Sequence, residues 1–114
     1  GDARRMLRRS KSWLTFYGHT HIPMIYSTGL KGFKRYPEDD DFCYALSKEK
    51  QYLINPGSVG QPRDLNPNAS FAILDTLENT IRIRRVNYDI CAAQNSILNA
   101  VLPKWHADRL AVGR

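Results

Sequence analysis

The sequence predicts a single domain of mixed α/β (α+β) class. Short runs rich in aromatic and β-branched residues alternate with turn-forming segments over residues 13–86, and both ends of the chain carry helical periodicity. A chain of 114 residues, 42% hydrophobic and 25% charged, is typical of one globular domain. No apolar run approaches the ~20 residues that span a bilayer. We expect a cytoplasmic protein without membrane partners.

The first predicted element is a basic helix within residues 1–11. Ala3, Met6 and Leu7 form an apolar stripe at helical spacing. Five of the 17 basic residues of the chain lie in this segment: Arg4, Arg5, Arg8, Arg9 and Lys11. The net charge of +6 favours phosphate or nucleic-acid contact. A solvated helix face is the simpler interpretation of the basic run.

Strands are predicted next. Residues 13–17 (WLTFY) and 22–27 (IPMIYS) are strand-like, and residues 28–41 read as a long loop. Residues 42–46 and 51–55 are expected to pair with each other. The two cysteines, Cys43 and Cys91, lack a partner motif and are expected to be small core residues of a reduced protein.

The clearest hairpin joins residues 69–75 to residues 80–86. Ile and Arg alternate over residues 81–84, so one face should be buried and the other basic.

The tail is predicted to be helical. Asp89 can cap a helix, and Pro103 can begin a second one. The apolar positions expected on these helices are Ile90, Ala93, Ile97, Val101, Trp105 and Leu110.

Two of the three histidines lie in the stretch FYGHTHIPMIY, residues 16–26. In an extended segment, His19 and His21 would project to the same side and could enter one metal site. Two polar residues at a strand end would give the same local pattern, and a closed structural zinc site lacks its four ligands.

A second stretch, YLINPGSVGQPRD at residues 52–64, is dense in turn formers. Its successive backbone N–H groups could form an anion-binding concavity. The guanidinium of Arg63 could add two parallel N–H donors to phosphate oxygens. For Asn55 and Ser58, turn structure and substrate contact remain open.

Together the two stretches resemble the C-terminal half of calcineurin-like metallophosphoesterases, in the branch of small bacterial and archaeal phosphodiesterases. The resemblance continues through ASFAILD and RVNYDICAA, so it extends from Trp13 to about Ala100. It implies the C-terminal part of a four-layer β-sandwich flanked by helices, with residues 1–114 forming the later portion of one domain.

The resemblance also implies a chemistry. His19 and His21 would each bind one of two divalent metals, manganese or else iron, nickel or zinc, in a phosphodiesterase or phosphatase that hydrolyses phosphoesters, including nucleotides, with a dimetal-activated hydroxide. Asn55, Ser58 and Arg63 would be the substrate-binding residues. No catalytic acid or base is assigned within this chain.

The sequence departs from the family pattern in two ways. The Asp-x-His, Gly-Asp-x-x-Asp and Gly-Asn-His motifs are absent, so we expect that the chain starts mid-protein and is inactive until joined to an N-terminal half or another copy. The acidic run at residues 38–41 is a poor replacement because such runs are usually solvated. A long segment, residues 29–50, separates the two motifs.

That long segment carries possible nucleotide contacts, with an exposed loop as the simpler alternative. The residues concerned are Lys31, Phe33, Lys34, Arg35 and Tyr36.

Two alternatives remain open. The chain could be a non-catalytic scaffold of the same fold, as the small retromer subunit is, or a basic nucleic-acid-binding fragment.

Overall fold

The computed structural model describes residues 2–29 and 32–114. Its elements are α1 (Asp2–Ser10), β1 (Leu14–Phe16), β2 (Met24–Ser27), β3 (Phe33–Arg35), β4 (Asp41–Ala45), β5 (Tyr52–Asn55), β6 (Ala69–Asp75), β7 (Thr80–Val86), α2 (Ile90–Asn99), α3 (Lys104–Asp108) and a 3₁₀ turn at Arg109–Ala111.

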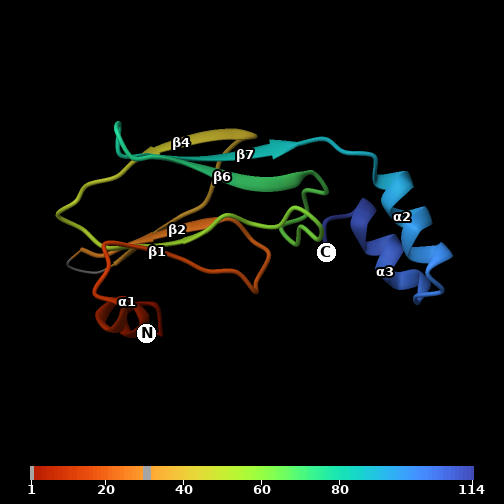
Figure 1. Cartoon of the computed structure of the whole chain (residues 1–114), viewed down its shortest axis with the longest axis horizontal. Coiled ribbons are helices and arrows are strands. Elements are labelled where there is room, and N and C mark those ends of the chain that lie inside the picture. The colour runs from red at the N-terminus through yellow and green to blue at the C-terminus, as the bar shows by residue number, and fades with distance from the viewer. Residues whose placement is uncertain (1, 30–31) are drawn as a thin grey trace.

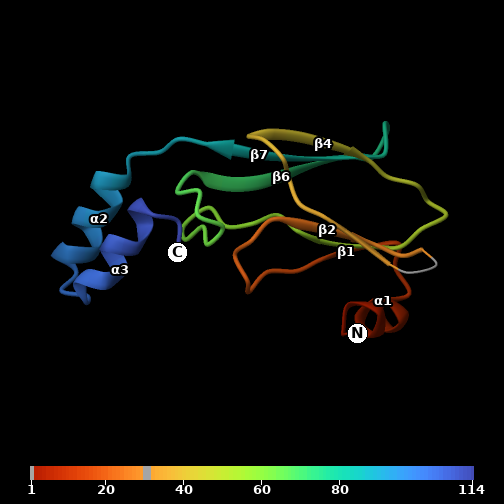
Figure 2. The same ribbon diagram turned by 180° about the vertical axis from the view of Figure 1, so that it is seen from behind.

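The strands form two sheets that lie face to face (Figures 1 and 2). One sheet has the order β1-β5-β2-β3, in which β1 and β5 are parallel and the other pairs are antiparallel. The other sheet, β4-β7-β6, is antiparallel throughout. The predicted mixed α/β (α+β) sandwich is confirmed.

The main core lies between the two sheets. Because side chains alternate along a strand, Tyr52 and Ile54 of β5 face the second sheet, whereas Leu53 faces the other way. Ile81 and Ile83 of β7 are fully buried opposite them. Burial of such aliphatic side chains, worth about 1.5–3 kcal/mol each, holds the two layers together.

Helix α1 covers the outer face of the four-stranded sheet (Figure 1). Leu7 is fully buried against Tyr26 and Leu53, so it fixes α1 to the sheet. Asp2 in the first turn and Arg8 and Arg9 in the last turn complement the helix dipole. The predicted basic helix is confirmed.

The predicted hairpin is also confirmed, with β6 and β7 in full register from Ala69↔Val86 to Asp75↔Thr80. Its alternation holds as expected. Ile81 and Ile83 are buried, and Arg82 and Arg84 are exposed.

Two strand predictions are wrong. Residues 42–46 and 51–55 do not pair, because β4 joins β7 whereas β5 lies between β1 and β2. The expected loop at 28–41 contains β3, which pairs with β2. In the first case the pairing partners are distant in sequence, which local patterns do not predict. In the second case β2 is near in sequence, and the glycines, proline and charged residues around β3 gave it the appearance of a loop.

The tail folds into α2 and α3, which pack on each other beyond the end of the sandwich (Figure 1). The Asp89 cap is confirmed, since its carboxylate accepts the Ala92 N–H at 2.9 Å. Pro103 is the N-cap of α3 rather than its first turn. Val101 lies outside α2 with φ +57° and is 90% exposed, and Trp105 is 57% exposed, so neither joins an apolar face.

Both cysteines are exposed and unpaired, so the expectation that they lie in the core is wrong. Cys43 lies on the outer face of β4, opposite Arg82. Helices long and apolar enough to cross a bilayer are absent from the described residues.

Candidate metal and phosphate site

Two loops meet at one edge of the four-stranded sheet. The histidine loop, residues 17–23, follows β1, and the glycine loop, residues 56–68, follows β5. Since β1 and β5 are parallel neighbours, with Phe16 opposite Ile54, their carboxyl ends bring the two loops side by side. This edge is where open α/β sheets commonly bind ligands.

The imidazole of His21 links the two loops. Its Nδ1 lies 2.8 Å from the Gln61 carbonyl oxygen, which can only accept, so Nδ1 carries the proton. In the neutral ring this leaves Nε2 as the unprotonated nitrogen, the form in which histidine ligates metals. The backbone N–H of Arg63 donates to the His21 carbonyl at 3.2 Å, which adds a second link.

His19 is exposed on the same loop. Its φ is +93° and that of His21 is +60°, so the expectation of an extended segment is wrong. Non-glycine residues at such angles are uncommon and cost about 1–3 kcal/mol, and they cluster at functional sites. The backbone that carries His19 and His21 is therefore a strained turn rather than a strand.

Asn55 is fully buried beneath both loops. Its amide nitrogen donates to the Thr20 hydroxyl at 2.9 Å, and its carbonyl oxygen accepts the Gly57 N–H at 2.9 Å. Burial raises the pKa of the Tyr17 phenol, an effect opposed by a hydrogen bond with Asn55 and reinforced by Tyr36. The contacts of Asn55 fit the structural role that its sequence position left open.

The glycine loop is held against β6. Ser70 donates its hydroxyl to the Pro56 carbonyl at 2.8 Å and its N–H to the Ser58 carbonyl at 2.9 Å. The Ser58 hydroxyl accepts the Gln61 N–H at 2.9 Å. Ser58 therefore shapes the turn that presents the Gln61 carbonyl to His21.

Arg63 is an exposed residue of the glycine loop. Its Nη2 donates to Gln61 Oε1 at 3.2 Å, a neutral partner that leaves the positive charge uncompensated by that contact. The guanidinium is thus available to an anion beside the loops.

An ion pair that sequence reasoning missed anchors the glycine loop. Arg85 contacts Asp64 twice, at 2.6 and 3.0 Å, with only 3% of the Arg85 side chain exposed. The sequence did hold a sign of this pair. Side chains alternate along a strand, so Arg85 lies on the same face of β7 as Ile81 and Ile83, which is the buried one.

A cleft of about 280 Å³ adjoins the histidine loop. Its lining residues are Tyr17, Thr20, Ile22, Met24, Lys34 and Tyr36. Lys34 and Tyr36 belong to the predicted nucleotide-contact set, whereas Phe33 is exposed elsewhere and Arg35 pairs with Glu38 at 2.8 Å. Lys31 lies outside the described residues.

Within residues 2–29 and 32–114, no three His, Cys, Asp or Glu side chains gather as a metal site. The acidic run at 38–41 is exposed, and Asp41 pairs with Arg82 at 3.2 Å. Among the described residues, His19 and His21 thus have no third potential ligand gathered with them, and the hydrogen bond of Nδ1 leaves Nε2 of His21 as the unprotonated nitrogen.

Comparisons with known proteins agree with this architecture. The family model of the calcineurin-like phosphoesterase superfamily domain matches residues 1–79. The uncharacterized protein MJ0912 of Methanocaldococcus jannaschii is 45% identical over 101 residues, 89% of this chain and 40% of that protein. A metallophosphoesterase crystal structure from Sphaerobacter thermophilus superposes with a TM-score of 0.83 at 37% identity.

The aligned region covers 90% of this chain and 43% of the Sphaerobacter chain. The chain thus spans less than half the length of either relative. By the family model and the shared fold, the chain belongs to the calcineurin-like phosphoesterase superfamily.

Proposed function

We propose that the protein acts as a metal-dependent phosphoesterase in which His19 and His21 supply metal ligands. The observation that carries the proposal is the 2.8 Å hydrogen bond from His21 Nδ1 to the Gln61 carbonyl. A histidine ligand almost always donates its second ring N–H in this way, which fixes the tautomer and the ring orientation.

The remaining ligands would come from outside residues 1–114, from an N-terminal half or another copy of the chain. Two divalent ions, with manganese as the first to test, would supply polarisation of a phosphoryl oxygen and activation of water. The two loops of this chain would hold the imidazoles in place and exclude water from one side of the site.

Arg63 is the proposed phosphate contact. It is exposed beside His21, and its fork of N–H donors matches two phosphate oxygens. Asn55 and Ser58 would support the loops from beneath, because their polar groups are bonded within the protein.

The lining of the cleft beside the histidine loop supports a proposal for the substrate class. Tyr17 and Tyr36 could stack on a flat ring, and Lys34 could pair with a phosphate. Since Thr20 lines the cleft between the two histidines, a phosphodiester with an aromatic or nucleoside group would reach both regions at once.

The test uses the complete protein, purified with manganese and assayed on bis(4-nitrophenyl) phosphate. We expect saturable hydrolysis that chelation abolishes and His21→Ala reduces by about 100-fold or more, in line with the loss of a metal-ligand contact. His106→Ala is the matched control, because His106 lies in α3 beyond the sandwich.

Manganese titration by calorimetry provides a readout independent of turnover. His21→Ala should weaken manganese binding, whereas His106→Ala should leave it unchanged. Equal binding by both variants and an absence of hydrolysis would contradict the proposal and favour a scaffold of the same fold.

A further inference from the structure

We propose that the outer face of α1 binds the phosphate backbone of a nucleic acid. This surface, termed the arginine surface, consists of Arg4, Arg5, Arg8 and Arg9. The inference is independent of the metal site, because it rests on a different element and a different face of the molecule.

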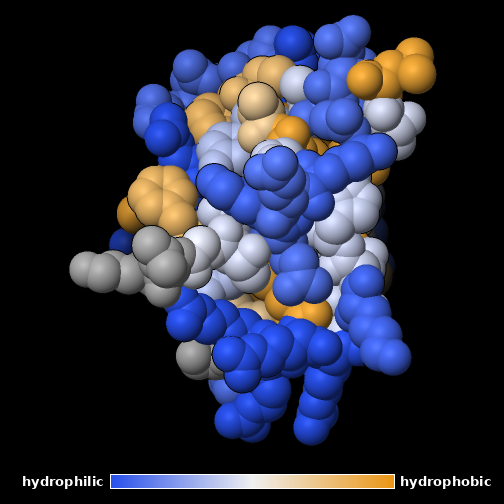
Figure 3. Space-filling model, turned by 90° about the vertical axis from the view of Figure 1, so that its left-hand side faces the viewer, coloured by the Kyte–Doolittle hydropathy of each residue, from blue (hydrophilic) through white to orange (hydrophobic). Residues whose placement is uncertain are grey.

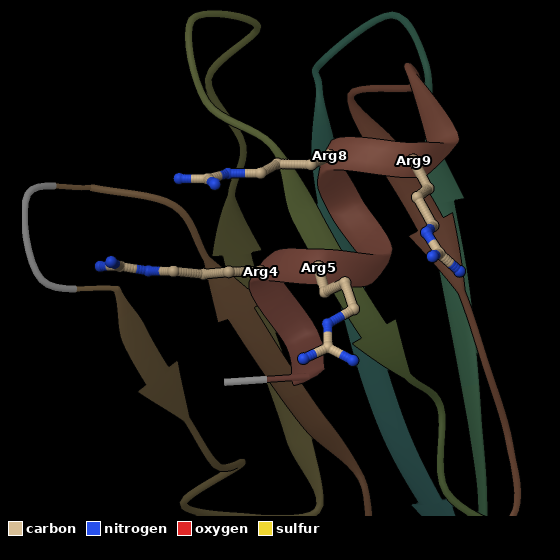
Figure 4. Close-up of a pocket in the computed structure, with 4 residues that line it drawn as sticks. All are labelled: Arg4, Arg5, Arg8 and Arg9. Carbon is tan, nitrogen blue, oxygen red and sulfur yellow. The ribbon is translucent and has the colours of Figure 1, made fainter.

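The four arginines form two rows along the helix. Figure 4 shows Arg4 and Arg8 extending in parallel on one side of α1, with Arg5 and Arg9 turned another way. Each row spans four residues, a rise of about 6 Å. A nucleic-acid strand carries one phosphate per ~3.4 Å of helix axis, so each row can meet separate phosphates of one strand.

The arginine surface is hollowed and basic. The four arginines line a hollow of about 480 Å³. Arg4 and Arg8 also line a groove of about 200 Å³, together with Thr28, Gly29 and Gln51. Among residues 2–29 and 32–114, no carboxylate lines either space. Hydrophilic side chains gather along the lower part of this end of the molecule, where α1 lies (Figure 3).

Repulsion among the four arginines lowers the stability of α1. Like charges at i and i+4 destabilise a helix, and α1 holds two such pairs, Arg4 with Arg8 and Arg5 with Arg9. Within the described part of the chain, Arg5, Arg8 and Arg9 form no ion pair, and Asp2 is the one acidic residue of α1. A polyanion would relieve this repulsion.

A lipid surface fits less well. Helices that lie on membranes insert a wide apolar face, but the apolar side of α1 is already used against the sheet. Leu7 is fully buried there, and Met6 is the large apolar residue of α1 that remains exposed, at 46%. The arginine surface therefore offers charge without an apolar face to insert.

The experiment measures binding of the purified protein to a fluorescein-labelled 20-nucleotide poly(U) RNA by anisotropy. Excess EDTA keeps metals out, so the result does not depend on the phosphoesterase proposal. The variant Arg5→Gln/Arg8→Gln/Arg9→Gln spares Arg4, whose Nε donates to the Tyr26 hydroxyl at 3.3 Å. Glutamine preserves helix propensity.

The control removes the same charge elsewhere. It is Arg84→Gln/Lys104→Gln/Arg114→Gln, three exposed positions on β7, α3 and the C-terminal end. Circular dichroism checks that each variant is folded. If the triple α1 variant does not fold, Arg8→Gln/Arg9→Gln replaces it.

We expect the triple α1 variant to bind poly(U) at least about tenfold more weakly at 50 mM salt, with the control within about threefold of the wild type. The slope of log K against log salt should fall by about 2 for the triple and about 1.4 for the double variant. Equal losses in the α1 variant and the control would overturn the proposal. Retention on phosphatidylserine vesicles without poly(U) binding would overturn it in favour of a membrane surface.

Discussion

Asn55 joins the two loops of the candidate site through a side chain that solvent does not reach. Its amide bridges Thr20 of the histidine loop and Gly57 of the glycine loop. A buried polar group left without its partner costs about 1–3 kcal/mol. Removal of the Asn55 amide leaves the half-buried Gly57 N–H without its acceptor, whereas the exposed Thr20 hydroxyl can turn to water.

We expect Asn55→Ala to lower the free energy of unfolding by about 2–3 kcal/mol. Urea unfolding followed by circular dichroism measures this as a lower midpoint at an unchanged slope. Asn95→Ala, at an exposed position of α2, should change stability by less than about 0.5 kcal/mol. Similar effects of the two variants would show that the Asn55 hydrogen bonds do not stabilise the loops.

Strand β7 permits a comparison between a buried ion pair, Arg85 with Asp64, and an exposed one, Arg82 with Asp41. Removing one partner of a buried pair costs about 3–5 kcal/mol, because the other charge stays buried. We expect Asp64→Ala to lower stability by about 3 kcal/mol, since the Asn66 carbonyl still accepts from Arg85.

The matched variant is Asp41→Ala, which removes the exposed partner of Arg82. The two side chains of that pair are 51% and 46% exposed, so the loss should stay below about 1 kcal/mol. High salt should weaken the Asp41 contribution and leave that of Asp64 nearly unchanged. A smaller loss for Asp64→Ala than for Asp41→Ala would contradict this account.

At the scale of elements, the glycine loop depends on one close approach. Gly57 has φ +85°, and a Cβ there would lie 2.5 Å from Ser70 Oγ and 2.7 Å from Ser70 Cβ. Gly57→Ala must therefore move β6 or the loop that carries Gln61.

We expect Gly57→Ala to destabilise the protein by about 2 kcal/mol or more through backbone strain and this contact. Gly60→Ala in the same loop meets no atom within 4 Å and has no positive φ, so its effect should be small or stabilising. Thermal unfolding of the pair measures the difference. His21-dependent manganese binding should fall only in Gly57→Ala, because that variant displaces the Gln61 carbonyl.

Local patterns in the sequence predicted α1, the β6–β7 hairpin and the Asp89 cap correctly, since each depends on residues near one another. The separation of β4 from β5 was missed, because β4 pairs with β7, whose residues lie far along the chain. Strand β3 was missed although its partner β2 is near in sequence, because the glycines, proline and charged residues around β3 are typical of a loop. At the site, the motifs located both loops. The link from His21 to a backbone carbonyl 40 residues later has no side-chain signal and could not be predicted.

The whole molecule is longer than a compact domain of its size. Its radius of gyration is 16.1 Å, against about 13 Å expected for 114 residues. The helices α2 and α3 project beyond the sandwich, and α2 has no fully buried residue (Figure 1). The spacing of apolar residues correctly predicted that these two segments are helical. It could not predict how little of the apolar face of α2 would be covered by the rest of the protein.

One edge of the four-stranded sheet is also uncovered. Within the described residues β1 pairs only with β5, so its other edge offers unpaired N–H and C=O groups, and Phe16 is 47% exposed there. Open edges with apolar side chains favour pairing with another chain. We therefore expect the isolated 114-residue chain to self-associate.

Sedimentation velocity over a 100-fold concentration range tests this expectation. The wild-type chain should shift from smaller to larger species, whereas Phe16→Lys should require about tenfold or higher concentration, because a lysine on an edge strand opposes pairing. Leu77→Lys is the control, since Leu77 lies in the β6–β7 turn and is 92% exposed. A wild-type chain that stays a sharply folded monomer throughout would contradict this expectation and show that the β1 edge is protected within this chain.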